Sequence, residues 1–142
     1  ARKCIAYLTI EYKGIIAEEL RRGIGNRVFG CDDCQLICPW NSFAKKASIE
    51  DFNPRHGLDQ ISLLDIWHWD ESTFLANTEG SPLRRTGYQS FMRNIAIGLG
   101  NAPFSAQILH SLRQTYATHD EIVQVHIDWA IAEQIAKSMA NT

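Results

Sequence analysis

The apolar positions in the second half of the chain recur at three- and four-residue spacing, which is the period of an amphipathic helix. Between residues 88 and 99 they are Tyr88, Phe91, Met92, Ile95 and Leu99. Similar series run from Ala106 to about Tyr116 and from about Glu121 to Met139, and a shorter one surrounds Trp67. The pattern predicts a mainly α-helical region built from consecutive short helices.

Polar residues and proline mark the expected ends of these helices. Asp70 is a candidate N-cap for the short helix that follows it, because its carboxylate can accept an amide hydrogen of the first turn. Ser81 with Pro82 predicts the start of the next helix, since a proline in the first turn removes no hydrogen bond. Gly98, Gly100 and Asn101, with Pro103, predict the end of that helix.

Consecutive short helices that each present one apolar stripe are typical of helical-repeat proteins. Residues 126–130 also resemble the second helix of a HEAT-like repeat. Only about two repeats fit, so we expect the array to bury its apolar face against the region that precedes it. A polar stretch at residues 45–48 marks the boundary between a first region at 1–47, which holds every cysteine of the chain, and a HEAT-like helical domain at 48–142.

Composition excludes some broad classes of protein. The chain has 142 residues and 45% hydrophobic content, which is enough for a packed core. Its 14 Lys and Arg against 16 Asp and Glu give a formal charge of −2, so nucleic-acid binding would need a local basic patch. No apolar run approaches the roughly 20 residues of a membrane span. We expect a soluble protein with no membrane partner.

The first region holds all four cysteines of the chain, Cys4, Cys31, Cys34 and Cys38. The last three form the pattern C-x2-C-x3-C, and Pro39 follows directly. This pattern matches the final cysteines of the bacterial ferredoxin run, whose last cysteine ligates a neighbouring cluster. A C-x2-C pair can reach two iron corners from one tight turn, while the third thiolate points away from that pair. The pattern predicts that residues 1–47 are an iron-sulfur region, with Cys4, Cys31 and Cys34 on one 4Fe-4S cluster and Cys38 on a second.

On this interpretation both clusters need further ligands. We expect them in a C-x2-C-x2-C-x3-C-P run directly upstream of residue 1, which would make the chain the C-terminal piece of a longer protein. Two other interpretations of the cysteines stay open. A tetrathiolate zinc site uses the same residue type but usually pairs two C-x2-C knuckles, of which the sequence has one. Two structural disulfides would require an oxidising compartment.

Several longer motifs together resemble a known family. They are Cys4-Ile-Ala-Tyr-Leu-Thr-Ile-Glu11, Gly30-Cys-Asp-Asp-Cys-Gln-Leu-Ile-Cys-Pro-Trp-Asn41, Gly80-Ser-Pro-Leu-Arg-Arg85, Arg93-Asn94 and Leu99-Gly-Asn101. Over essentially the whole chain these motifs resemble the C-terminal part of bacterial epoxyqueuosine reductase. Ala6 departs from the pattern, since we expect the family usually to carry serine there.

The resemblance implies a mainly α fold: half of a ferredoxin-like module with two 4Fe-4S clusters, followed by a short HEAT-like α-helical repeat domain. It implies an oxidoreductase that converts epoxyqueuosine to queuosine at the wobble position of certain tRNA anticodons, using cobalamin and both clusters. The implied partners are that tRNA and a low-potential electron donor, and we expect a cytoplasmic monomer. Most of the cobalamin site and the acidic proton donor are expected outside this chain, so the fragment alone is expected to be inactive.

Carried over to this sequence, the resemblance makes the four cysteines the cluster ligands. Their polar neighbours are candidates to face the cobalamin or the flipped nucleotide, although each also fits a role behind the cysteine ligands or at the surface. These neighbours are Tyr7, Thr9, Asp32 and Asp33. No histidine is assigned a catalytic role.

Basic residues are the candidates for tRNA binding, because guanidinium groups pair with phosphates and can stack on bases. The candidates are Arg84, Arg85, Arg93, Lys45 and Lys46. Arg85 and Arg93 are expected on one face of the helix that begins at Ser81, since they are eight residues apart. An ordinary solvated helix face would carry the same residue types.

A second functional class also stays open. The same architecture fits an electron-transfer or adaptor module, in which a ferredoxin-type half is fused to a helical scaffold that recruits a redox protein. A contribution of the arginines to tRNA binding would separate the enzyme from the adaptor. Zinc in place of iron would leave a metal-stabilised helical domain.

Overall fold

The computed structural model describes residues 2–45, 57–58 and 60–140, and these residues form helices and turns without a β-strand. Short 3-10 or π-helical turns, labelled η, alternate with α-helices. The elements in chain order are η1 (Tyr7–Glu11), α1 (Glu18–Ile24), α2 (Asp33–Leu36), η2 (Pro39–Phe43), α3 (Leu63–Trp67), α4 (Glu71–Asn77), η4 (Pro82–Thr86), α5 (Tyr88–Asn101), α6 (Ala106–Thr115), η5 (Tyr116–Thr118) and α7 (Glu121–Ala140). The predicted mainly α fold is confirmed, and no described helix could span a membrane.

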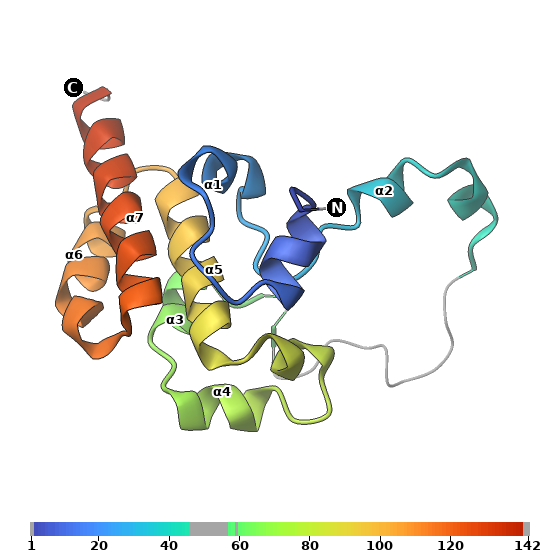
Figure 1. Ribbon diagram of the computed structural model, residues 1–142, viewed down its shortest axis with the longest axis horizontal. Coiled ribbons are helices and arrows are strands. Elements are labelled where there is room, and N and C mark those ends of the chain that lie inside the picture. Colours follow the sequence, from blue (N-terminus) through green and yellow to red (C-terminus); the bar gives the residue numbers. More distant parts are fainter. Residues whose placement is uncertain (1, 46–56, 59, 141–142) are drawn as a thin grey trace.

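Helix α5 lies at the centre of the molecule, with α7 on one side and the N-terminal segment on the other (Figure 1). Its most extensive contact is with α7, and it also packs against α1, α3 and η1. Every residue from Ser90 to Gly100 is buried. A helix buried on all sides is normally apolar all round. Arg93 and Asn94 break that rule in α5, so their polar groups need partners inside the protein.

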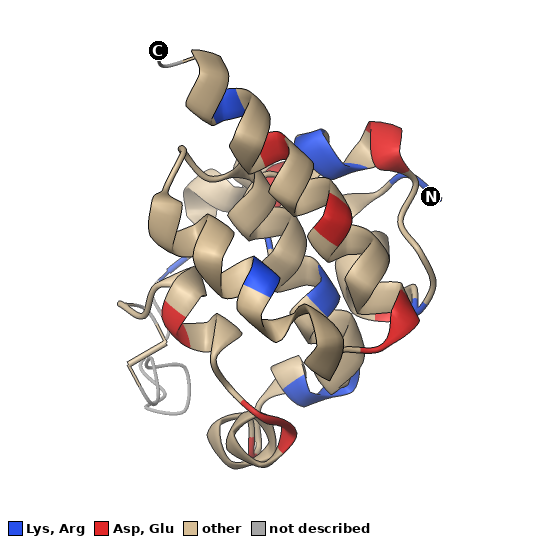
Figure 2. Ribbon diagram, turned by 90° about the vertical axis from the view of Figure 1, so that its left-hand side faces the viewer, with Lys and Arg blue, Asp and Glu red and all other residues tan. Residues whose placement is uncertain are grey.

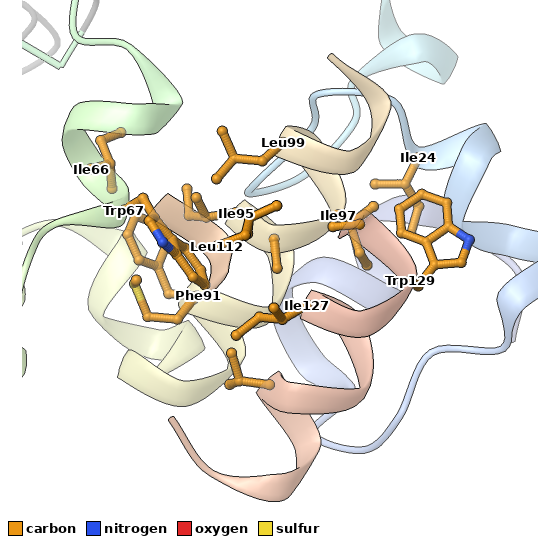
Figure 3. Close-up of a cluster of buried hydrophobic side chains, with 14 of the residues drawn as sticks. Ile24, Ile66, Trp67, Phe91, Ile95, Ile97, Leu99, Leu112, Ile127 and Trp129 are labelled. Atoms are coloured by element: carbon orange, nitrogen blue, oxygen red, sulfur yellow. The ribbon is translucent and has the colours of Figure 1, made fainter. Parts of the chain in front are cut away.

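Apolar side chains from both halves of the chain meet in one core around α5 (Figure 3). The first region contributes Leu8, Ile16 and Ile24, and the helical region contributes Trp67, Phe91, Ile95, Leu112 and Ile127 among others. The helical array therefore does bury its face against the preceding region, as expected. The boundary predicted between residues 47 and 48 lies outside the described residues, and the HEAT-like assignment stays a prediction.

The helix boundaries agree with the sequence in part. Asp70 caps α4 as predicted, since its carboxylate accepts the amide of Thr73 at 2.8 Å. Ser81 caps only the short turn η4, and α5 begins after Gly87, whose φ of +75° ends that turn. The prediction of one helix from Ser81 onward is therefore wrong.

The helix ends at Asn101, within the predicted stop, although Gly98 and Gly100 lie inside α5. Both glycines allow a close approach of neighbouring groups. A Cβ atom at Gly100 would lie 2.6 Å from Trp129 Cζ3 and 2.9 Å from the backbone of Ala130 in α7. At Gly98 it would meet Leu63 Cδ1 at 2.6 Å, the end of a flexible side chain, and then nothing closer than 3.8 Å.

Gly100→Ala is expected to lower the free energy of unfolding by about 1–3 kcal/mol, because α5 and α7 must separate to admit the methyl group. Gly98→Ala is the matched control, since Leu63 can rotate away and alanine favours the helix by up to about 1 kcal/mol. Urea unfolding of both variants measures the difference. Equal destabilisation would contradict the close α5–α7 contact as the cause.

His126 joins α7 to the first region. Its Nε2 accepts the backbone N–H of Ile16 at 3.1 Å, and its Nδ1 donates to the carbonyl of Ile122 at 2.7 Å. This arrangement requires a neutral ring with the proton on Nδ1. Burial lowers the pKa of His126 to about 4.

This lowered pKa predicts a pH-dependent stability. Unfolded His126 takes up a proton near pH 6.5, whereas the folded form does so only near pH 4. The stabilisation is therefore complete above about pH 6.5 and is lost as pH falls toward 4, by about 1.4 kcal/mol per pH unit where the loss is steepest. Urea unfolding across this range should show the slope in the wild type and in His110→Gln, an exposed control, and a clearly smaller slope in His126→Gln.

Candidate iron-sulfur site

Cys4 lies directly before the helical segment that contains η1, and its side chain is exposed. The backbone N–H groups of Tyr7 and Ala6 donate to its sulfur, and they lower the pKa of the thiol. Amide hydrogen bonds stabilise a thiolate and also tune sulfur ligands of iron. The local structure thus suits Cys4 as a metal ligand.

The other three cysteines lie on an arm formed by α2 and η2, which projects away from the helical body (Figure 1). Cys31 is flanked by two residues with left-handed backbone, Gly30 at φ +76° and Asp32 at φ +56°. Cys34 lies in the four-residue helix α2, and Cys38 directly precedes the turn that begins at Pro39. The three cysteines therefore lie before, within and after the short helix α2.

The loop around Cys31 is held by charged neighbours. Arg27 donates to both carboxylate oxygens of Asp33 at 3.0 Å. The pKa of Asp33 is lowered, first by a hydrogen bond from the Cys31 thiol and then by Arg27. Asp33 therefore has two hydrogen-bond partners, Cys31 and Arg27. The side chains of Asp32 and Tyr7 are exposed.

Arg93 is the one arginine candidate that the structure removes from the RNA-binding set. Its side chain is 0% exposed, and burial lowers its pKa to about 10, so it stays charged at neutral pH. The guanidinium donates to the carbonyls of Leu8, Tyr12 and Gly14 at 2.8 Å each, and twice to Asn94 Oδ1. These bonds use all five N–H groups of an arginine, so none is left for a phosphate. The expectation that Arg93 shares a solvent face with Arg85 is wrong.

Asn94 and Thr9 extend this network to both cysteine-bearing segments. Asn94 Nδ2 donates to the carbonyls of Thr9 and Val28 at 2.8 Å. Thr9 is itself 0% exposed, so it cannot face a cobalamin or a nucleotide as the sequence analysis suggested. Its hydroxyl accepts the N–H of Gly30 at 3.0 Å, directly before Cys31. Sequence reasoning missed Asn94 and the internal roles of Thr9 and Arg93.

The remaining basic candidates are at the surface. Arg84 is exposed and donates to the carbonyl of Leu75, and Arg85 is 68% exposed and pairs with Glu11 at 2.6 Å. Lys45 is exposed, while Lys46 lies outside the described residues. Figure 2 shows Lys and Arg segments interspersed with Asp and Glu segments. On the side seen in Figure 2, basic and acidic segments are therefore mixed, and no broad basic face is visible.

The chemistry of the four sulfur atoms fits iron-sulfur clusters better than the two alternatives. All four cysteines are free, so the disulfide interpretation is not realised. Among the residues that the structure describes, no three His, Cys, Asp or Glu side chains converge as ligands of one metal ion. A tetrathiolate zinc site and a cubane both bring thiolates together, the cubane at separate iron corners. It is therefore the C-x2-C-x3-C-P spacing, with only one C-x2-C pair in the sequence, that favours the clusters.

Comparison with known proteins adds an independent line of support. Residues 1–41 match the family described as 4Fe-4S double cluster binding domain. The chain is 55% identical over 131 residues to an epoxyqueuosine reductase of Pseudomonas aeruginosa, and 50% identical over 140 residues to one of Escherichia coli. The resemblance to epoxyqueuosine reductase is confirmed. These matches cover 92% and 99% of the chain but 36% and 37% of the relatives, so it spans about a third of their length.

Solved structures of epoxyqueuosine reductase have the same fold over nearly all of the chain. One was determined with an epoxyqueuosine-modified tRNA stem loop; it superposes with a TM-score of 0.67 at 20% identity. That comparison covers 94% of this chain and 44% of the solved one. A structure of the Bacillus subtilis enzyme gives the same TM-score and identity.

Proposed function

We propose that this chain is part of an epoxyqueuosine reductase and supplies cluster ligands and tRNA-binding surface to it. The observation that carries the proposal is the position of Cys4, Cys31, Cys34 and Cys38 within the segment that matches the double-cluster domain. Cys4, Cys31 and Cys34 would hold one cluster and Cys38 would help to hold the other. The full protein would reduce epoxyqueuosine in a tRNA anticodon, with cobalamin bound mostly by residues outside this chain.

The clusters would supply one-electron transfer from a low-potential donor toward the cobalamin. The residues of this chain would orient the cysteine ligands. Amides of Ala6 and Tyr7 point at Cys4, Asp33 bonds Cys31, and the α5 side chains fix the backbone behind both cysteines. A cobalamin-facing role of Tyr7, Asp32 and Asp33 stays a prediction that rests on their position beside these cysteines.

The tRNA-binding surface would centre on Arg84 and Arg85. Arg85 and Lys13 line one groove of about 650 Å³ beside the first turn of α5. Glu71 and Asp120 line the same groove, so a phosphate would bind at its basic side. Lys13 also donates to the carbonyls of Arg85 and Thr86, which fixes η4 on the first region. Lys45 and Lys46 remain further candidates.

The full-length protein purified without oxygen is expected to hold ~8 iron atoms per chain, the content of two 4Fe-4S clusters. Cys34→Ala should lose about half of this iron, because one cluster loses a ligand. Gln35→Ala, an exposed neighbour in α2, is the control and should keep it. Metal analysis and EPR measure the outcome. Zinc in place of iron would overturn the proposal.

Replacing Arg84 and Arg85 together with alanine should weaken tRNA binding by the full-length protein. Removing two phosphate-contacting charges should also reduce the slope of log affinity against log salt concentration by roughly 1–2. The matched control is the double variant Arg22→Ala with Arg113→Ala, which removes the same charge from other exposed positions. Equal weakening in the control would indicate a general charge effect. Unchanged binding in both would favour the electron-transfer or adaptor alternative.

A further inference from the structure

One buried hydroxyl connects the backbones on which Cys4 and Cys31 lie. Thr9 Oγ1 donates its hydrogen to the carbonyl of Ile5 at 2.8 Å, one residue after Cys4. The same oxygen accepts the N–H of Gly30 at 3.0 Å, one residue before Cys31. The two cysteines are 27 positions apart in the chain, yet their neighbouring peptides share one side-chain oxygen.

The bond to Gly30 lies at a point where the backbone is unusual. Gly30 has a φ of +76°, in the region that glycine adopts without strain. The side chain of Ile10 lies 4.0 Å from the place where a Cβ would project from Gly30. Ile10 of η1 therefore packs directly against the peptide that leads into Cys31. Rotation of this peptide would change the direction of the thiol.

Helix α5 fixes the same two segments from behind. Asn94 donates to the carbonyl of Thr9 and to that of Val28, two residues before Gly30. Arg93 donates to the carbonyl of Leu8. The hydroxyl of Thr9 is thus held on a backbone that has little freedom to move, and it is fully buried. The hydroxyl is therefore shielded from competing water.

We propose that Thr9 is a positioning residue for the cluster held by Cys4, Cys31 and Cys34; the inference rests on the proposed function, which makes these cysteines its ligands. The hydroxyl fixes the peptide before Cys31 relative to the peptide after Cys4. In the full protein, this link would help to hold the two cysteine-bearing segments at the separation that one cluster requires. Thr9 acts through the backbone and does not touch the iron.

The chain offers a closely matched control. Thr78 is also 0% exposed and also donates its hydroxyl hydrogen to the carbonyl four residues earlier, that of Phe74, at 2.7 Å. Within the described residues, Thr78 makes no hydrogen bond to a cysteine-bearing segment. Thr9→Val and Thr78→Val therefore remove the same kind of local bond, and only Thr9→Val releases Gly30. Thr9→Ser keeps the hydroxyl and is the conservative variant.

The experiment uses the full-length protein, purified without oxygen, and measures iron content, the EPR spectrum and the rate of iron loss to a chelator. Thr9→Val is expected to lose about half of its iron about tenfold faster than the wild type, in the range for losing a group that orients a metal ligand. The EPR signal of one cluster should change with it. Thr78→Val and Thr9→Ser should stay within about twofold of the wild type.

Two results would overturn the inference. One is loss of iron from Thr78→Val as fast as from Thr9→Val, which would indicate general destabilisation. The other is rapid loss from Thr9→Ser, which can be measured even if Thr9→Val does not fold, and which would show that the hydroxyl is not the cause. If the wild type itself holds no iron, the proposed function fails. If the wild type holds both clusters and Thr9→Val matches it, only this inference fails.

Discussion

The structure depends on hydrogen bonds from buried polar side chains of α5 to the backbone of the first region. Residues 8–30 combine irregular backbone with the short elements η1 and α1, whose last carbonyl groups have no partners in a helix ladder. Arg93, Asn94 and Asn101 supply these partners, at Leu8, Tyr12 and Gly14, at Thr9 and Val28, and at Arg21 and Gly25. A hydrogen bond to a charged donor contributes about 1.5–3 kcal/mol, whereas a buried charge without partners costs several kcal/mol. The guanidinium is therefore stable only where the first region surrounds it.

Local signals in the sequence were enough to predict the helices and some of their caps. Asp70 could be assigned from its own side chain and the residues that follow it, because a cap is a contact over three residues. The start of α5 was misplaced because the cap rule describes only the first turn after the cap. Ser81 does cap a turn, but that turn ends at Gly87. An N-cap does not determine the length of the helix that follows it.

The candidate site was predictable only where chemistry lies in the residue type. Three cysteines at ferredoxin spacing, with a fourth upstream, pointed to iron and sulfur without any structure. Arg93 was assigned to RNA because arginine is usually exposed. Its burial arises from carbonyl groups that lie about 80 residues earlier in the chain, and no helical period encodes them. Thr9 was misplaced likewise, since its partner Gly30 is 21 residues away.

The backbone next to the four cysteines is therefore held by the core to different degrees. Cys4 precedes a segment bonded to α5, and Cys31 follows a peptide bonded to Thr9. Cys34 and Cys38 lie farther along an arm whose apolar side chains Leu36, Ile37, Trp40 and Phe43 are 75–82% exposed. A helix of four residues such as α2 is not stable by its own hydrogen bonds. Because metal binding contributes directly to folding where ligands join separate segments, iron bound at Cys34 and Cys38 would stabilise the part of this chain that its own core supports least.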